Sequence, residues 1–154
     1  MDPQALRACS LFQALGADQL RKVAAIATHR DLGAGEVVFR EGDPGDEMFV
    51  VVAGKVRISK QVQGVGEEAL TILESGSYFG EMAMMDDSPR SADALAHTTC
   101  ALAVIRREEL DQLMFVDRDL AYALLWTFVR TLASRLRETN EKIRAFFAMS
   151  GPPS

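Results

Sequence analysis

Two side chains of opposite charge flank a short stretch of the sequence, FGEMAMMDDSPRSA, at residues 79–92. Glu81 follows a glycine, and Arg90 follows a proline nine residues later. An ionised carboxylate accepts hydrogen bonds and can hold sugar hydroxyls, whereas a guanidinium presents a planar fork of donors that suits a phosphate. These residue types therefore suggest a ligand that carries one phosphate and a ribose.

The residues between this pair support that interpretation, although each charged residue also has a simpler explanation. Met82–Met85 can form a single helical turn, whose N-terminus would point free N–H groups at an anion. Gly80 would let a ligand approach the backbone closely. In the simpler explanation, Glu81 only complements the dipole of this turn, and Arg90 is a surface residue of a loop.

Few other residues could support catalysis. Cys9 and Cys100 form no CxxC motif, which argues against a zinc site or a disulfide framework. His29 and His97 occur in no HxH or HxE arrangement, so a metal enzyme built on a cupin-like barrel is the disfavoured alternative. No serine–histidine–aspartate or cysteine–histidine arrangement is recognisable. We therefore expect no catalytic residue, no metal and no cofactor.

The composition indicates an acidic globular domain, because the chain has 154 residues and a formal net charge of −5. No apolar run approaches the ~18 residues that span a bilayer, and the N-terminus does not resemble a signal peptide. We therefore expect a cytoplasmic protein with no membrane contact. Basic residues cluster at residues 130–144, but Glu138 and Glu141 are interleaved with them, so a solvated helix face is favoured over a nucleic-acid surface.

The elements that position the charged pair are expected to be helices around a set of strands. Asp2 and Pro3 predict a helix start, and apolar residues at helical spacing predict a second helix near residues 17–27. From residue 31 to residue 105, glycines separate short β-rich runs, which predicts a compact antiparallel barrel or roll. We expect VAGKV at residues 52–56 to be a hairpin turn, and QGVGEE at residues 63–68 to be a longer, mobile one.

Helical periodicity returns after residue 105. It predicts a short helix at residues 107–115 and a long one that Asp117 caps, that runs to about residue 149 and that GPPS ends. Leu120, Ala121, Leu124 and Phe128 could face the strands. The later part carries an apolar repeat with spacings of four and three, which we call the heptad seam. Either this seam packs on its own barrel, or it forms a parallel homodimer, which is the arrangement that we expect. The seam positions are Leu125, Val129, Leu132, Leu136, Thr139, Ile143 and Phe146.

Taken together, these motifs resemble the cyclic-nucleotide-binding domain of the catabolite activator protein superfamily. The family's phosphate-binding cassette reads roughly FGE, a few apolar residues, a short loop and then PR followed by a small residue, which residues 79–81 and 89–92 match. EGDPGDEMFVVVAGKVRI at residues 41–58 resembles the family's glycine-bracketed hairpin, and SLF at residues 10–12 with Leu15 resembles its opening. The resemblance covers roughly residues 10–147.

The resemblance implies a mainly β fold, in which an antiparallel, jelly-roll-like β-roll is followed by a short and a long C-terminal helix. It divides the chain into N-terminal helices at about 1–27, a β-roll at 28–105 with the cassette at 79–92, and C-terminal helices at 106–149. We expect residues 1–154 to form a single cyclic-nucleotide-binding domain.

The resemblance also implies roles for residues of the cassette. Glu81 would accept a hydrogen bond from the ribose 2′-hydroxyl, and Arg90 would pair with the cyclic phosphate. Ser91 would donate to the same phosphate. The residues that would lie along the ligand, partly through backbone groups, are Gly80, Met82 and Ala83.

The long helix is expected to contribute the rest of the site. Its tail, SRLRETNEKI, is similar to the family segment in which a threonine–serine pair contacts adenine. Thr139 and Asn140 match that pair, which would explain the polar residue in the seam. Arg135 lies one turn earlier and would brace Glu81. The strand after the cassette departs from the family, because Asp93 stands where a β-branched, basic stretch is common.

These features favour a sensor that binds a cyclic nucleotide, most readily cAMP, and relays occupancy through the long helix to an unknown partner protein. A regulatory fragment of a larger transcription factor, kinase or channel is an alternative, as is a binder of cGMP or a cyclic dinucleotide. The Met1 start and the terminal GPPS favour a complete chain. No winged helix-turn-helix follows the long helix in this sequence, so we expect no sequence-specific DNA binding by this chain alone.

Overall fold

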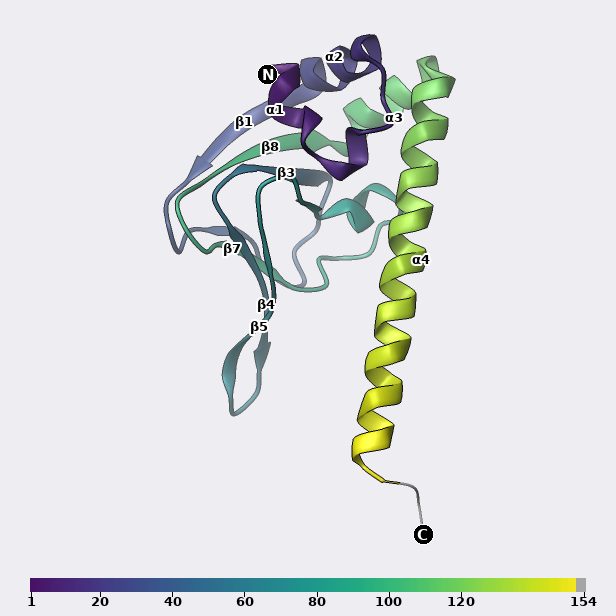
Figure 1. The fold of residues 1–154 in the computed structure, drawn as a ribbon. Coiled ribbons are helices and arrows are strands. Elements are labelled where there is room, and N and C mark those ends of the chain that lie inside the picture. The colour runs from purple at the N-terminus through teal and green to yellow at the C-terminus, as the bar shows by residue number, and fades with distance from the viewer. Residues whose placement is uncertain (152–154) are drawn as a thin grey trace.

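Three short helical segments open the structure, a computed structural model that describes residues 1–151. They are α1 (Pro3–Arg7), the 3-10 segment η1 (Ser10–Phe12) and α2 (Ala17–Ile26). The expected start of the first helix is confirmed, because the Asp2 carboxylate accepts a hydrogen bond from the Gln4 backbone N–H at 2.9 Å. In Figure 1 these segments gather over one end of the strands, beside the first turns of the long helix.

Antiparallel strands form two four-stranded sheets, which confirms the expected β-roll. The first sheet has the order β1-β8-β3-β6, and its strands are Ala27–Leu32, Cys100–Arg106, Glu47–Ala53 and Tyr78–Phe79. The second has the order β2-β7-β4-β5, and its strands are Val37–Phe39, Asp93–Ala96, Val56–Val62 and Gly66–Leu73.

The two faces of the first sheet pack into different cores, as the alternation of side chains along a strand requires. In β8, Ala103 and Ile105 join a core shared with α1, α2 and the long helix, whereas Leu102 and Val104 join the core between the two sheets. Phe79 at the end of β6 also belongs to the core between the sheets. The cassette, whose first residue is Phe79, therefore begins at a buried, fixed point.

The expected hairpin at VAGKV is wrong. β3 pairs with β6 and β8, whereas β4 pairs with β5 and β7, so the turn at Gly54 carries the chain from one sheet to the other. The expected hairpin at QGVGEE is present, but its turn is shorter than predicted, because β4 runs to Val62 and β5 begins at Gly66. Local turn residues indicate that the chain reverses, but they do not say which strands then pair.

Strand β1 was not among the predicted β-rich runs. Only its end residues, Ala27 and Leu32, are buried, and the four residues between them are exposed. The strand therefore shows neither a continuous apolar run nor a clear alternation, and pairing with β8 alone holds it at the edge of the first sheet.

The C-terminal helices α3 (Arg107–Val116) and α4 (Arg118–Met149) agree with the sequence prediction. The Asp117 carboxylate caps α4 by accepting a hydrogen bond from the Leu120 N–H at 3.0 Å, and it also accepts one from Lys22 at 2.9 Å. Leu120, Leu124 and Phe128 are buried and Ala121 is half-buried, so the first turns of α4 face the roll as expected.

Beyond Phe128, α4 runs on past the roll (Figure 1). The chain turns at Gly151, and the last three residues of the expected GPPS stop lie outside the described residues. Within residues 1–151, no helix combines the length and the apolar character needed to cross a membrane.

Gly54 and Gly64 provide a matched test of the crossing between the sheets. Both have a φ of +81°, which strains any side-chain-bearing residue. A β-carbon at Gly54 would also overlap Thr99 and Cys100, whereas one at Gly64 would meet open space. We expect Gly64→Ala to lower the free energy of unfolding by about 1–2 kcal/mol. Because the tight contact adds to that strain, Gly54→Ala should cost more than about 3 kcal/mol. Urea titration measures both, and equal losses would contradict the close approach.

Candidate functional site

The turn after β6 buries the carboxylate of Glu81. Gly80 has a φ of +75°, which only glycine adopts at little cost, and it leads into the 3-10 turn η2 (Glu81–Met84). The predicted helical turn is therefore present, but it starts one residue earlier than expected. It places Glu81 at 3% exposure and Ala83 at 4%, whereas Met82 is half exposed.

Arg90 lies inside the roll, with only 8% of its surface exposed. Its Nη1 donates to the Gly80 carbonyl at 3.1 Å, and its Nη2 donates to the Glu47 carbonyl at 2.8 Å. The guanidinium carbon lies 4.2 Å from the centre of the Phe39 ring and 5.7 Å from that of Phe49. Burial lowers the pKa of Arg90 below its ordinary value, and nearby carboxylates, Glu47 first among them, oppose this change.

The Nε–H of Arg90 is buried without a hydrogen-bond partner. An unsatisfied buried donor on a charged group is costly, so the site favours an anion that could accept from it. Gly45 lies against this edge of the guanidinium, and a β-carbon there would overlap it. Arg90, Gly45 and Gly80 thus lie together around one buried positive charge, and we call this arrangement the cradle.

Glu81 is tied to the long helix by an ion pair. Arg135 on α4 donates through Nη1 to Glu81 Oε1. The Glu81 side chain is 5% exposed and that of Arg135 is 47% exposed, so a buried carboxylate meets a half-buried guanidinium. This contact between Arg135 and Glu81 was expected from the sequence. It links the cassette to a helix that starts only at Arg118, after β7, β8 and α3.

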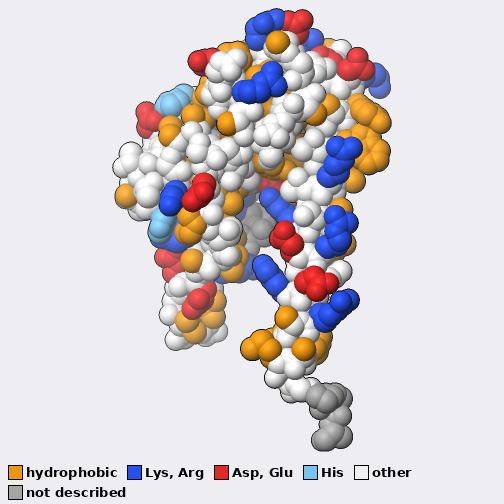
Figure 2. Space-filling view, in the orientation of Figure 1, with side chains coloured by type: hydrophobic (Ala, Val, Ile, Leu, Met, Phe, Trp, Pro, Cys, Tyr) orange, Lys and Arg blue, Asp and Glu red, His pale blue; other side chains and the backbone are white. Residues whose placement is uncertain are grey.

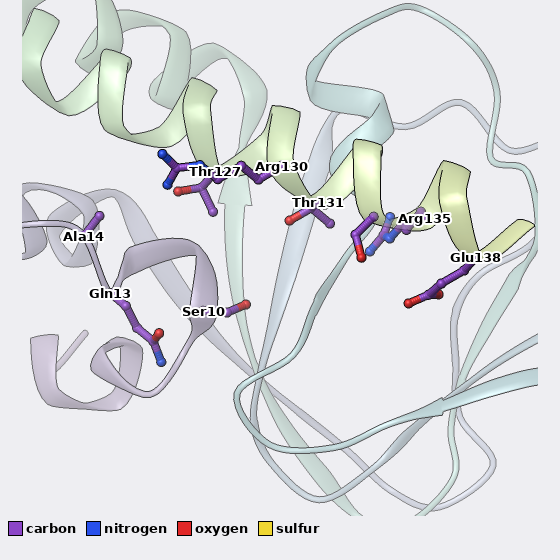
Figure 3. A pocket seen from close by; sticks show the side chains of 9 residues that line it. Ser10, Gln13, Ala14, Thr127, Arg130, Thr131, Arg135 and Glu138 are labelled. Atoms are coloured by element: carbon purple, nitrogen blue, oxygen red, sulfur yellow. The ribbon is translucent and has the colours of Figure 1, made fainter.

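A polar groove lies next to this ion pair, between η1 and α4 (Figure 3). Its volume is about 570 Å³. The Tyr78 hydroxyl donates to Thr131 Oγ1 at 2.8 Å beside it, and burial raises the pKa of Tyr78 above its ordinary value. Because Arg135 is shared by the groove and the ion pair, the groove borders the site. The lining residues are Ser10, Gln13, Ala14, Thr127, Arg130, Thr131, Ser134, Arg135 and Glu138.

The structure brings some of the predicted site residues together and leaves others apart. Glu81 and Arg90 lie close together, because Arg90 donates to the carbonyl of Gly80, the residue directly before Glu81. Ser91 is exposed next to Arg90. Thr139 and Asn140 are exposed on α4, about one turn beyond Arg135, and make no hydrogen bond to the cassette within the described residues.

Sequence reasoning missed several residues that shape the cradle. The aromatic wall of Phe39 and Phe49 carries no motif, since an apolar residue in a strand is equally expected in any core. Gly45 and Glu47 lie in the glycine-bracketed segment at residues 41–58, which had been matched to the family as a whole. A glycine two residues before a strand was the available signal for Gly45.

Chemistry other than anion binding finds little support in the described part of the chain. No group of three or more His, Cys, Asp or Glu side chains within residues 1–151 could hold a metal ion. Cys9 and Cys100 are both buried, and burial raises the pKa of the Cys9 thiol to about 11. A thiol with that pKa is a poor nucleophile at neutral pH.

Comparison with known proteins gives a consistent result. The family model described as "Cyclic nucleotide-binding domain" matches residues 29–117. A CRP-like cAMP-activated global transcriptional regulator of Mycobacterium tuberculosis is 33% identical over 113 residues, which are 73% of this chain and 49% of that protein. Human cGMP-dependent protein kinase 2 is 29% identical over 147 residues, which are 94% of this chain and 19% of the kinase.

The fold is likewise similar to that of the Thermus thermophilus catabolite activator protein. The TM-score is 0.79 at 30% sequence identity, and the match covers 88% of this chain and 62% of that one. The chain thus spans about half the length of the mycobacterial relative and about a fifth of the human kinase.

The ion pair between Glu81 and Arg135 can be tested in the ligand-free chain. Arg135→Met would leave the Glu81 carboxylate buried without its partner, so we expect the free energy of unfolding to fall by about 1–3 kcal/mol. Adding Glu81→Gln removes the buried charge and should restore part of the loss in a double-mutant cycle. Arg130→Met is the control, because Arg130 lines the same groove and has no acidic partner within the described residues. A coupling energy near zero would show that the pair contributes nothing to stability.

Proposed function

The chain belongs to the cyclic nucleotide-binding domain family, and we propose that it binds cAMP between the cassette and α4 and relays occupancy through α4 to a partner protein. The observation that carries the proposal is the buried Arg90, whose Nε–H lacks a partner, beside the buried Glu81. One side chain supplies positive charge for a phosphate, and the other supplies an acceptor for a sugar hydroxyl.

In this proposal the two charged residues divide the ligand between them. The cyclic phosphate carries one negative charge, which needs a partner in a site shielded from water, and Arg90 supplies it. Ser91 donates a further hydrogen bond to the phosphate, and Met82 and Ala83 line the ligand through η2. Glu81 repels the phosphate at long range, so it helps binding only through the ribose 2′-hydroxyl and acts as a selector for an intact ribose.

The base is read by α4 in this proposal. Successive residues of a helix are turned by about 100°, so Thr139 lies on the side of Arg135 while Asn140 points towards the opposite flank of the heptad seam. The mycobacterial relative is cAMP-activated and the human relative is cGMP-dependent, as their names state. We take cAMP as the first candidate ligand and cGMP as the alternative.

A parallel homodimer along the heptad seam accounts for the exposed face of α4. Figure 2 shows apolar side chains exposed along the outer edge of α4 and at its far end. Leu125, Val129 and Leu136 are each more than half exposed in the single chain, and a second copy would cover them. Thr139 would then contact the ligand of its own chain, and Asn140 that of the other chain.

This arrangement gives a physical route for the relay. The ribose hydroxyl would donate to the same Glu81 carboxylate that Arg135 contacts, so ligand binding would change the ion pair that ties α4 to the cassette. A ligand that also touches the seam favours one arrangement of the two helices over another. Binding energy is thereby coupled to the position of α4, which is the requirement for allostery.

Calorimetric titration with cAMP, cGMP and cyclic di-GMP tests the ligand. We expect cAMP to bind most tightly, and Arg90→Ala to weaken it by about 2–5 kcal/mol, because the phosphate would lose its charged partner. Arg90→Lys should recover only part, because an ammonium lacks the planar fork. If Arg90→Ala bound cAMP within twofold of the wild-type affinity, the assignment of Arg90 to the phosphate would be refuted.

The same titration with 2′-deoxy-cAMP separates the role of Glu81 from that of Arg90. Glu81→Gln should weaken cAMP and shrink the penalty for the missing hydroxyl, because that hydroxyl would lose its ionic acceptor. Arg90→Ala serves as the control and should keep the full 2′-deoxy penalty. An equal penalty in the wild type and in Glu81→Gln would remove Glu81 from ribose recognition.

Sedimentation at tens of micromolar tests the dimer. Val129→Glu or Leu136→Glu would bury like charges at the two-fold seam and should cost several kcal/mol of association energy. Arg137→Glu is the control, because residue 137 is exposed and lies off the seam. The dimer-breaking variants should also lose cAMP-over-cGMP discrimination, as should Thr139→Ala combined with Asn140→Ala. A wild type that sediments as a monomer with and without cAMP would contradict the dimer.

A further inference from the structure

The loop between β2 and β3, at residues 40–46, contacts both the backbone and the side chain of Arg90. The Gly42 N–H donates to the Arg90 carbonyl at 2.8 Å, and the Arg90 N–H donates to the Asp43 carbonyl at 2.8 Å. Gly45 lies against the guanidinium, and the strand that follows presents the Glu47 carbonyl to Nη2. The orientation of Arg90 therefore depends on where this loop lies.

Backbone pairing between β2 and β7 lapses just before this loop. The two strands pair at Val37 with Leu95 and at Phe39 with Ala94. Further along, the backbones of Gly42 and Asp43 bond to that of Arg90, but between Phe39 and Gly42 no backbone bond to β7 is formed among the described residues. The loop is thus tied to the cassette arm at one end and to β7 at the other, with a gap between.

The side chain of Asp93 spans that gap. Asp93 is 3% exposed at the start of β7, and its Oδ1 accepts a hydrogen bond from the Glu41 backbone N–H at 2.7 Å. Its Oδ2 accepts from Arg40 Nη1 at 3.3 Å. The Arg40 N–H in turn donates to Asp43 at 2.9 Å, which closes the turn of the loop. The Asp93 carboxylate therefore accepts the hydrogen bond of the Glu41 N–H, in the interval where no backbone carbonyl of β7 does so.

The surroundings of Asp93 leave the loop otherwise weakly attached at this point. An open cavity of about 500 Å³ lies beside it, lined by Arg40, Glu41, Gln61 and Asp93. Across the sheet, Asp93 is in register with Ser59 on β4, whose hydroxyl is buried and has no partner. A second side-chain tether is the ion pair of Glu41 with Lys60 at 3.3 Å, in which both side chains are about half exposed. Solvent screens such a pair far more than it screens the Asp93 carboxylate, whose side chain is 4% exposed, so the Asp93 contacts are the stronger tether.

We infer that Asp93 is a positioning residue for phosphate recognition, which it serves by fixing the loop that orients Arg90. The inference rests on the proposed function, because it concerns the site that would hold the cyclic phosphate. Burying a carboxylate is unfavourable unless it is hydrogen-bonded, and the hydrogen bonds that the Asp93 carboxylate accepts come from Arg40 and Glu41 of the loop. This role would explain why an aspartate stands at residue 93, where the family commonly has a β-branched, basic stretch.

The two phosphorothioate diastereomers of cAMP provide the test. Each replaces one of the two exocyclic phosphate oxygens by sulfur, so the ratio of their affinities reports how specifically the guanidinium addresses one oxygen. We expect Asp93→Ala to weaken cAMP about tenfold and to bring this ratio closer to one. The 2′-deoxy penalty should stay within about twofold of wild type, because Glu81 is held by α4 instead. Asp93→Asn keeps an acceptor for the Glu41 N–H, so its diastereomer ratio should lie between those of the wild type and Asp93→Ala.

Amide hydrogen exchange in the ligand-free chain tests the clamp without any nucleotide. Asp93→Ala should speed exchange at Gly42 and Arg90 relative to the β8 amides. Arg57→Ala is the control for both measurements, because it breaks a pair with Glu67 on the same sheet and should change neither. If Asp93→Ala does not fold, Arg40→Ala removes only the half-exposed ion-pair partner and should shift the ratio in the same direction by a smaller factor.

The possible outcomes separate the inference from the function on which it rests. A wild type that binds none of the cyclic nucleotides refutes the proposed function, and the phosphate role of Asp93 with it. A wild type that binds cAMP while Asp93→Ala, Asp93→Asn and Arg40→Ala all keep the wild-type diastereomer ratio refutes only the role of Asp93. Lower thermal stability with an unchanged ratio would make Asp93 a structural residue.

Discussion

A positive charge buried between two sheets is the constraint around which the site is organised. Removing a guanidinium from water is unfavourable unless its donors are met, and the carbonyls of Gly80 and Glu47 meet two of the donor groups of Arg90. These carbonyls belong to different segments, so one side chain joins the cassette to the first sheet. The ring of Phe39 comes from the second sheet. Both sheets must therefore be in place before the cradle exists.

The attachment of α4 changes character along its length. Leu120, Leu124 and Phe128 anchor its first turns in the core, which is held by burial of apolar surface. Beyond them, the contacts with the roll are polar: Thr131 with Tyr78, and Arg135 with Glu81. Apolar burial offers no readily exchanged partner, whereas a hydrogen bond or an ion pair can be exchanged for a ligand group. The start of the helix is thus held by apolar packing, whereas the contacts of its later turns with the roll are of a kind that a polar ligand can replace.

Much of the fold could be predicted from the sequence because its signals are local. The cap at Asp117, the apolar faces of α4 and the glycine-separated strand runs each involve neighbouring residues. The crossing at Gly54 and the edge strand β1 could not be predicted, since both depend on which distant strands pair. In the site, Glu81 and Arg90 stood out through their motif, whereas Phe39 resembled any core residue. Asp93 was noticed as unusual, but its partners lie fifty residues away.

The shape of α4 gives small movements at its base a mechanical consequence. The part beyond Phe128 reaches Met149 without leaving the helix, a rod of about 30 Å at 1.5 Å per residue. A helix of this kind would act as a lever if it pivoted on the buried cluster at its start. A tilt of about 10° at the fulcrum would sweep the tip through about 5 Å, which is about one helical turn. Rearrangements too small to disturb the packed core of the roll would therefore suffice to move the exposed end of the helix by the length of a turn.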